Sequence, residues 1–174
     1  MTKDDNAEAV EKFCVDIAAD LKAKGFRVKL DNRDMRTPDK MWDAVKKGVP
    51  IRVEVGGREM EAGELTYVRR DIGRESKTTL KTDDFVSQAQ TILDDIHDNM
   101  LARTRQFRDD NTHDVETLDE VEAFFKADKL GFTRAPIAIL DDPNLEKIMS
   151  EYSLSTRNMP LSDNGEKVLI SKAY

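Results

Sequence analysis

The sequence of 174 residues lacks most of the features that mark specialised classes of protein. It has one cysteine, Cys14, which excludes an internal disulfide framework and a zinc site built from several cysteines. Aromatic residues make up only 6% of the chain. No run of about 18 apolar residues occurs that would span a membrane, and the opening MTKDDNAEAV does not resemble a signal peptide. These absences predict a folded protein of the cytoplasm.

Charged residues, in contrast, are abundant and unevenly distributed. The net charge is −7, yet residues 22–81 hold 16 Lys and Arg against 10 Asp and Glu. The rest of the chain holds 12 against 25. A basic region beside an acidic one predicts a surface that faces a polyanion, next to one that faces solvent or protein. Chance clustering of surface charge is the alternative on composition alone.

Hydrophobic periodicity divides the chain into alternating helices and strands. A capping box at Thr117 and Glu120 marks one helix start, and a proline at the first helical position, Pro38, marks another. The predicted helices cover 6–24, 37–47, 83–109, a short segment after Thr117, and 143–152. The predicted strands cover 26–31, 49–55, 64–71, 77–80, 132–140 and 167–174, with 49–71 as a β-hairpin. The pattern predicts an α/β fold with a mixed sheet flanked by helices.

Two groups of apolar residues are expected in the core. Met41 and Trp42 lie on the second predicted helix, and an apolar seam follows the long helix from Val86 to Phe107. Cys14 lies on the apolar face of the first helix, which favours a buried thiol over a reactive one.

The stretch GFRVKLDNRDMRTPDKMWDAVKKGVPIRVEVGGREMEAGELTYVRRD resembles the anticodon-binding domain of a prolyl-tRNA synthetase, a class II aminoacyl-tRNA synthetase. The later segments ARTRQFRDDNT, STRNMPL and the final KAY resemble the extra C-terminal domain of the archaeal/eukaryotic-type prolyl enzymes. The resemblance implies an anticodon-binding domain over 1–96 and a smaller α+β C-terminal domain over 97–174, with the boundary inside the long helix.

The resemblance also implies a function and partners. The chain would be the tRNA-anticodon recognition module of a proline–tRNA ligase, whose full enzyme attaches proline to tRNA with ATP and Mg²⁺ in a catalytic domain. That domain is absent from this segment, so the segment would bind proline tRNA without aminoacylating it. The implied partners are proline tRNA and the catalytic domain of a homodimeric parent enzyme, which Tyr174 would contact.

The sequence departs from the family pattern in two ways that bear on structure. The family domain opens with an apolar, central strand before the first helix, and this sequence starts after it, so we expect an empty slot in the sheet or one filled by another molecule. Many family members hold zinc through four cysteines, but Asn158 stands where one of them is expected and the others are missing. No zinc or other cofactor is expected in this segment.

The candidate RNA-binding residues are the charged side chains around the open face of the predicted sheet. A proline anticodon ends in two guanines; the carboxylate of Glu54 would accept hydrogen bonds from N1–H and N2–H of a guanine, and Arg52 would donate to O6 and N7. The predicted set is Arg33, Asp34, Lys40, Arg52, Glu54, Arg58, Arg69 and Arg70. Lys46 and Lys47 would contact phosphates. Cross-strand ion pairing on a solvated sheet is the alternative for each residue.

Two other functions stay open at this point. One is a stand-alone protein- or RNA-interaction module without anticodon specificity. The other is a metal-dependent hydrolase that uses His97 and His113, which lie beside acidic residues but lack a two-histidine ligand spacing. We expect no catalytic residues in the segment, because nucleophile and phosphate-loop motifs are missing.

Overall fold

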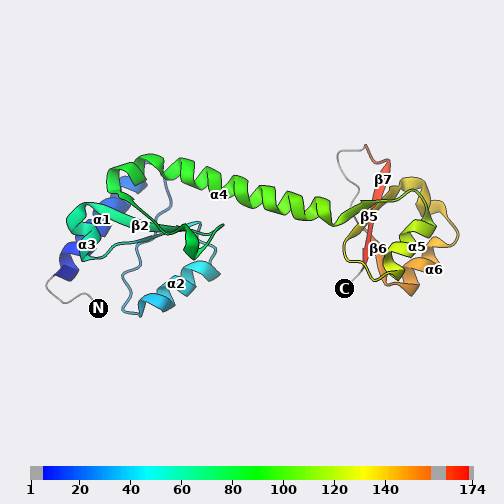
Figure 1. Ribbon diagram of the computed structural model, residues 1–174, viewed down its shortest axis with the longest axis horizontal. Coiled ribbons are helices and arrows are strands. Elements are labelled where there is room, and N and C mark those ends of the chain that lie inside the picture. Colours follow the sequence, from blue (N-terminus) through cyan, green and yellow to red (C-terminus); the bar gives the residue numbers. More distant parts are fainter. Residues whose placement is uncertain (1–5, 158–163, 173–174) are drawn as a thin grey trace. The chain divides into compact units, whose positions relative to one another are not determined.

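The computed structural model describes residues 6–157 and 164–172, so the predictions for Asn158 and Tyr174 lie outside the described residues. The chain separates into two compact units, Met1–Leu101 and Ala102–Tyr174. The division falls within the helix α4 (Thr82–Asp110), which is drawn in green in Figure 1. Each unit is described by itself.

The first unit contains a three-stranded sheet with strand order β1–β2–β3, in which both pairs are antiparallel. Its elements are α1 (Ala7–Ala23), α2 (Thr37–Lys46), β1 (Ile51–Glu54), α3 (Gly57–Ala62), β2 (Glu64–Arg69), β3 (Thr78–Lys81) and the first part of α4. Within this unit α4 lies on one side of the sheet and α2 on the other (Figure 1).

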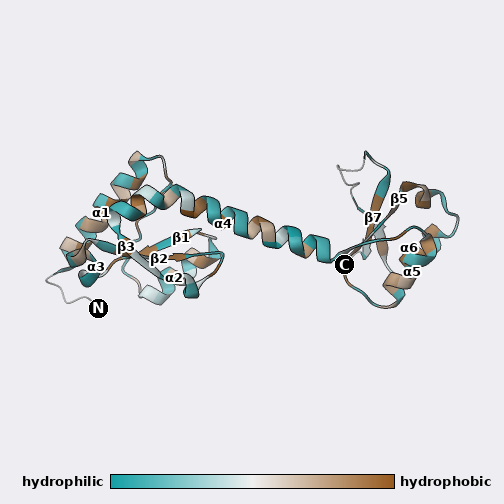
Figure 2. Cartoon of the chain, turned by 45° about the horizontal axis from the view of Figure 1, so that its top comes forward, coloured by the Kyte–Doolittle hydropathy of each residue, from teal (hydrophilic) through white to brown (hydrophobic). Residues whose placement is uncertain are grey.

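The core of the first unit lies between the sheet and the helices α1 and α4. Leu65 and Tyr67 of β2 point to this side, and the Tyr67 ring packs on Phe85 of α4 with ring centroids 5.3 Å apart. Ile17 and Leu21 close the core from α1. Thr66 and Val68, on the opposite face of β2, are buried as well, so this central strand is covered on both faces. Figure 2 shows hydrophilic residues recurring along the whole of α4, with apolar ones at intervals.

The strand predicted over 26–31 is wrong. Phe26 and Val28 do pack on the core of the first unit, as the alternation predicts. The segment nevertheless joins no sheet, and the backbone oxygen of Asp31 accepts a hydrogen bond from the side chain of Lys40 at 3.2 Å instead. A strand needs a neighbouring strand that completes its backbone hydrogen bonds. Since β1 pairs with β2, it does not pair with the segment 26–31.

The hairpin of β1 and β2 is confirmed, and the connection between its strands contains a helix that was not predicted. Residues 57–62 form the short helix α3, whose Glu59 carboxylate accepts a hydrogen bond from the Gly56 N–H at 3.0 Å. Glu and Met favour helix, and this acceptor replaces a missing partner at the helix start. Gly63 ends the helix in the left-handed conformation, with φ of 64°.

The second unit contains a four-stranded mixed sheet with strand order β4–β5–β7–β6, in which β4 and β5 are parallel and the other pairs antiparallel. Its elements after α4 are β4 (Thr112–Asp114), α5 (Leu118–Lys126), β5 (Phe132–Pro136), a 3₁₀ segment (Ile137–Asp141), α6 (Leu145–Glu151), β6 (Leu154–Thr156) and β7 (Lys167–Lys172). The core joins α5 and α6 to the central strands, where Ala135 and Ile170 are fully buried. The predicted α/β class, with mixed pairing and flanking helices, is confirmed.

In the second unit the sequence predicts the start of α5 correctly, whereas it predicts the strands less well. Thr117 caps α5 as predicted, since its Oγ1 accepts a hydrogen bond from the Glu120 N–H at 3.3 Å. The strand predicted over 132–140 ends at Pro136, and the 3₁₀ segment follows. The strands β4 and β6 were not predicted, because three residues are too few to show alternation.

Two aromatic residues that the sequence placed in the core are exposed instead. The exposed fraction is 64% for Trp42 and 71% for Phe107. Trp42 lies on α2, a helix without a buried residue. Phe107 lies past Ile96, the last buried residue of α4. The helical spacing of both was correct, but periodicity does not show where the surface that covers an apolar face ends.

Candidate nucleic-acid interface

The face of the first sheet that turns away from α4 carries the charged residues of β1. Ile51 and Val53 pack against the core, so the intervening Arg52 and Glu54 project to the opposite face. The Arg52 Nε donates to the Glu54 carboxylate at 3.0 Å, and Lys77 Nζ lies 3.5 Å from the other carboxylate oxygen. The exposed fraction of the side chain is 19% for Arg52 and 30% for Glu54. The sheet face therefore offers both donors and an acceptor, held in one ion-paired group.

Arg33 lies in a second ion-paired group beside α2. Its guanidinium donates two hydrogen bonds to Asp31, at 2.8 and 2.7 Å, and one to Asp43 at 2.8 Å. Lys47 Nζ approaches the same Asp43 carboxylate at 3.7 Å. The hydrogen bonds from Arg33 lower the pKa of Asp31 and of Asp43 below their usual range. The charge of Arg33 is thus largely balanced, and the two aspartates rather than RNA hold its orientation.

Arg69, the last residue of β2, and Arg70, which follows the strand, contact different parts of the unit. Arg69 is paired with Ile51 in the core-facing register and donates to Asp71, with Nε–Oδ1 3.1 Å and Nη2–Oδ2 2.8 Å. Its remaining nitrogen bonds Asp95 of α4. These bonds link the end of β2 to α4. Arg69 therefore does not lie on the face that carries Arg52 and Glu54.

Arg70 is the exposed cation of this pair. Its Nη1 donates to the backbone oxygen of Gly48 at 3.4 Å, and no carboxylate pairs with it in the described part of the chain. Gly48, with φ of 68°, lacks the Cβ that would stand 3.2 Å from the guanidinium carbon. The end of α2 and the end of β2 are therefore close enough for one ligand to meet both.

The remaining predicted residues are distributed unequally around this face. Lys40 bonds the Asp31 backbone and is partly buried, whereas Asp34 is exposed without a side-chain bond to another described residue. Lys46 is exposed, with no ion pair to the described residues. Arg58 is an exposed residue of α3, which packs on α1 and β2.

The structure adds three residues that the sequence reasoning missed. Asp31 and Asp43 balance Arg33, and Lys77 joins the pair of Arg52 and Glu54. The spacing of four residues between Asp43 and Lys47 on a helix was a signal that the sequence contained. The contact of Lys77 with Glu54 depends on the register of β2 with both neighbours, which the sequence did not show.

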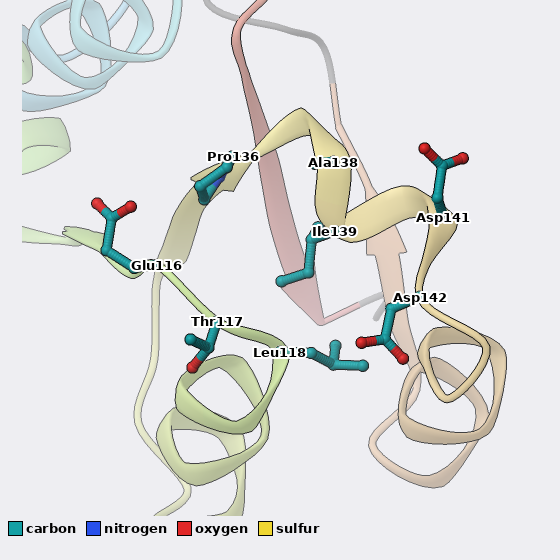
Figure 3. A pocket seen from close by; sticks show the side chains of 8 residues that line it. All are labelled: Glu116, Thr117, Leu118, Pro136, Ala138, Ile139, Asp141 and Asp142. Carbon is teal, nitrogen blue, oxygen red and sulfur yellow. The ribbon is translucent and has the colours of Figure 1, made fainter.

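The second unit carries a hollow of about 390 Å³ between the start of α5 and the 3₁₀ segment (Figure 3). Its lining residues are Glu116, Thr117, Leu118, Pro136, Ala138, Ile139, Asp141 and Asp142. Three of these are carboxylates, and Lys167 Nζ, 3.5 Å from Glu116, is a nearby cation. The negative charge of the hollow does not suit a polyanion.

The groups considered for other chemistry are dispersed. Within residues 6–157 and 164–172, His, Cys, Asp and Glu form no cluster of three that could hold a metal. His97 is an exposed residue of the first unit, and in the second unit the His113 ring packs at a tilt against the Phe124 ring, with centroids 4.9 Å apart. Cys14 is half-buried, and burial raises the pKa of its thiol, with Glu11 adding to the effect. Among the described helices, none has the length and apolar character needed to cross a membrane.

The comparisons with known proteins agree with the fold. The model of the anticodon-binding domain family matches residues 1–92. The chain is 33% identical over 165 residues to a proline–tRNA ligase of Bdellovibrio bacteriovorus and 37% identical over 175 residues to that of Paramagnetospirillum magneticum. These alignments cover 90% and 95% of this chain but only 31% and 34% of the relatives. The chain thus spans about a third of the length of these curated relatives.

Solved structures show the same architecture. The prolyl-tRNA synthetase of Giardia lamblia matches with a TM-score of 0.79 and 24% identity over 99% of this chain and 40% of its own. That of Cryptosporidium parvum matches with a TM-score of 0.80 and 21% identity over 100% of this chain and 38% of its own. The family match, which covers more than half of the chain, and the curated relatives together establish that this protein belongs to the anticodon-binding domain family, with the prolyl-tRNA ligases as its relatives.

Proposed function

We propose that this chain recognises the anticodon of proline tRNA as one part of a proline–tRNA ligase. The observation that carries the proposal is the ion-paired group of Arg52, Glu54 and Lys77 on the face of the first sheet that turns away from α4, in a chain of this family. The group presents a carboxylate and two cations to one ligand. Anticodon bases are single-stranded and expose the edges that such side chains bond.

Glu54 is the proposed reader of a guanine. A carboxylate accepts from N1–H and N2–H of guanine together, which neither adenine nor the pyrimidines offer in the same pattern. The ion pairs with Arg52 and Lys77 hold the Glu54 carboxylate in one orientation before RNA arrives. Arg52 supplies donors that can turn to O6 and N7 of a base.

The cations at the edge of this face are proposed to hold the backbone of the RNA. Arg70 and Lys46 have no carboxylate partner among the described residues, so a phosphate would not have to displace one. Such contacts set the position of the RNA without reading its sequence. Arg33 and Lys40 would support the face by fixing the chain around Asp31, and Asp34 would be a further acceptor beside them.

The rest of the enzyme is part of the proposal. Attachment of proline to tRNA with ATP and Mg²⁺ would occur in a catalytic domain that the relatives' additional length can contain. Tyr174 would contact that domain, and the parent enzyme would be a homodimer of the cytoplasm. In this proposal the chain binds tRNA, and no residue of the chain takes part in catalysis.

The test compares two transcripts at one moderate salt concentration. One is proline tRNA, and the other has both anticodon guanines replaced, with the rest unchanged. The protein is titrated to about 100 μM, because non-specific RNA binding falls in this range. We expect the first transcript to bind roughly ten-fold more tightly, which corresponds to one good base contact. Equal binding of both would contradict anticodon recognition and would support an interaction module without anticodon specificity.

A further inference from the structure

The sheet of the first unit leaves the outer side of β1 without a neighbouring strand. In the order β1–β2–β3, β1 pairs with β2 alone. The Arg70 N–H donates to the Pro50 oxygen at 2.9 Å, so in this antiparallel register every second residue from Pro50 onward bonds β2 through its backbone. The backbone groups of the residues between them, Ile51 and Val53, therefore point to the outer edge, where no described backbone group bonds them.

The segment 26–31 does not complete this edge. Its residues Phe26 and Val28 pack on the same core as Ile51 and Val53 of β1. Within the described part of the chain, however, no backbone hydrogen bond joins the segment to β1. A strand with an unpaired edge is a template for pairing with another strand. The edge of β1 therefore has both the apolar side chains and the free backbone groups that an added strand needs.

The charge pattern of β1 fits a second copy of the same strand. Antiparallel pairing of two copies around Val53 places Arg52 of one copy opposite Glu54 of the other, and Ile51 opposite Val55. Opposite charges that face each other across an antiparallel pair are stabilising, and a twofold axis makes this contact twice. The residues that would exchange backbone hydrogen bonds in this register are the ones whose backbone groups point outward.

The edge at β3 lacks this self-complementarity. The strand β3 also pairs with β2 alone. Antiparallel pairing of two copies of β3 around Thr79 would place Lys77 of one copy opposite Lys81 of the other. Like charges directly opposite each other are destabilising, and lysines at a sheet edge protect it against strand addition. Of the two edges of this sheet, β1 is thus the one that suits a second copy.

We propose that two copies of this chain associate through their β1 strands, which pair antiparallel around Val53 and join the two sheets into one. The proposal does not rest on RNA binding. Arg52 and Glu54 of each copy would form ion pairs with Glu54 and Arg52 of the other, in addition to the pair within each strand. Because β1 has only four residues, the interface is short, and association should be weak.

The first test measures the mass and the amide exchange of the full chain without RNA. Sedimentation equilibrium over about 5 to 500 μM covers the range expected for a small interface, and the apparent mass should rise from one chain towards two. Hydrogen exchange followed by NMR should show the Ile51 and Val53 amides slowed at the highest concentration only. The Arg52 and Glu54 amides, which bond β2, should be slowed at every concentration and are the internal control.

Charge variants test the register. Arg52→Glu gives a strand with two acidic residues, Glu54→Arg gives one with two basic residues, and each should weaken self-association roughly ten-fold. An equimolar mixture of the two variants should associate again, because an acidic strand then meets a basic one. Lys81→Glu makes the same change of net charge at the β3 edge and should associate as wild type does. Circular dichroism checks that each variant is folded.

Four outcomes would overturn the proposal. A chain that stays monomeric while the Ile51 and Val53 amides exchange rapidly has an edge that no second copy occupies. A monomer in which these amides are protected at every concentration has the edge covered by a segment of its own chain. Association that leaves these amides exchanging rapidly uses another surface. A mixture of Arg52→Glu and Glu54→Arg that associates no better than either variant alone contradicts the pairing of these two residues between copies.

Discussion

The two units of this protein differ in what they do with apolar side chains on their helices. In the second unit, α5 buries Val121 and Phe125 almost completely, and α6 buries Leu145 and Ile148. In the first unit, α2 has a similarly amphipathic sequence but buries no residue. The helices α5 and α6 of the second unit thus complete a core. The helix α2 of the first unit contributes no buried residue and lies on the side of the sheet that carries Arg52 and Glu54.

This difference separates stability from recognition within the first unit. Its core lies on the α4 side of the sheet, where Phe85 and Leu65 are fully buried. The proposed RNA contacts lie on the α2 side, where ion pairs hold the charged side chains beside the buried Thr66 and Val68 of β2. Substitutions on the two sides should therefore affect different measurements.

The largest expected effect compares two phenylalanines of the same helix. Phe85 has an exposed fraction of 1%, and Phe107 one of 71%. Phe85→Ala should lower the free energy of unfolding by about 3 to 5 kcal/mol, because it removes buried area and leaves a cavity. Phe107→Ala should change it by less than about 0.5 kcal/mol. Urea unfolding followed by circular dichroism measures both, and similar losses for the two variants would contradict the described burial.

A second large effect is expected from the network at the end of β2. The side chain of Asp71 is fully buried against Arg69, while that of Asp95, which bonds the same arginine, is 62% exposed. Asp71→Ala leaves Arg69 without its buried partner and should cost about 3 kcal/mol of unfolding free energy. Asp95→Ala, the matched control, should cost less than about 1 kcal/mol. Equal costs would show that the buried pair has no special role.

The same network makes stability depend on pH in a definite direction. The hydrogen bonds from Arg69 lower the pKa of Asp71 to about 2 in the folded chain, from 3.8. A group whose pKa is lowered by folding stabilises the fold above its unfolded pKa and loses that effect as the pH falls through its folded pKa. The difference in stability between wild type and Asp71→Ala should therefore shrink from about pH 4 to about pH 2. A difference that stays constant over this range would contradict the assignment.

A smaller effect, on recognition alone, is expected from the charged face. Glu54→Gln replaces a paired acceptor by a side chain with one acceptor and should reduce the preference for the guanine transcript roughly ten-fold. Glu64 of β2 is a matched control, since it is also ion-paired, to Lys81 at 3.0 Å, and is 33% exposed against 30% for Glu54. Glu64→Gln should leave the preference unchanged. Loss of preference in both variants would point to net charge and not to base contact.

The smallest expected effect concerns the start of α5. Thr117→Ala removes the acceptor for the Glu120 N–H and should lower the unfolding free energy of the chain by about 1 kcal/mol. Thr117→Ser keeps the acceptor and should restore most of the loss. In α2 the corresponding residue, Arg36, makes no side-chain cap, so Arg36→Ala should change stability by less than Thr117→Ala does. Thermal unfolding of the three variants orders them, and the reverse order would contradict the comparison of the two helices.

Several elements could be predicted because their signals are local. The helix α1, the proline-started α2 and the capped α5 depend on spacing and on a few residues at their ends. The hairpin of β1 and β2 follows from alternation on either side of a glycine pair. The family could also be inferred, since its motifs are contiguous in the sequence.

The failures have a common physical cause. The segment 26–31 alternates as a strand does, yet a strand exists only where another backbone completes its hydrogen bonds. Trp42 and Phe107 have the spacing of core residues, yet burial requires a facing surface. The candidate site was predicted as one set of charged residues. In the structure, two members of that set, Arg33 and Arg69, form ion pairs with aspartates.

The sequence by itself determined the helices other than α3, most strands, the basic character of residues 22–81 and the family, because these are properties of neighbouring residues. Only the tertiary structure decided which cations are balanced, since Arg69 meets Asp95 across 26 residues and Lys77 meets Glu54 across 23. It also decided that Trp42 stays in solvent. Pairing and burial depend on which surfaces meet after folding, and that is set by the packing of the whole unit and not by any one segment.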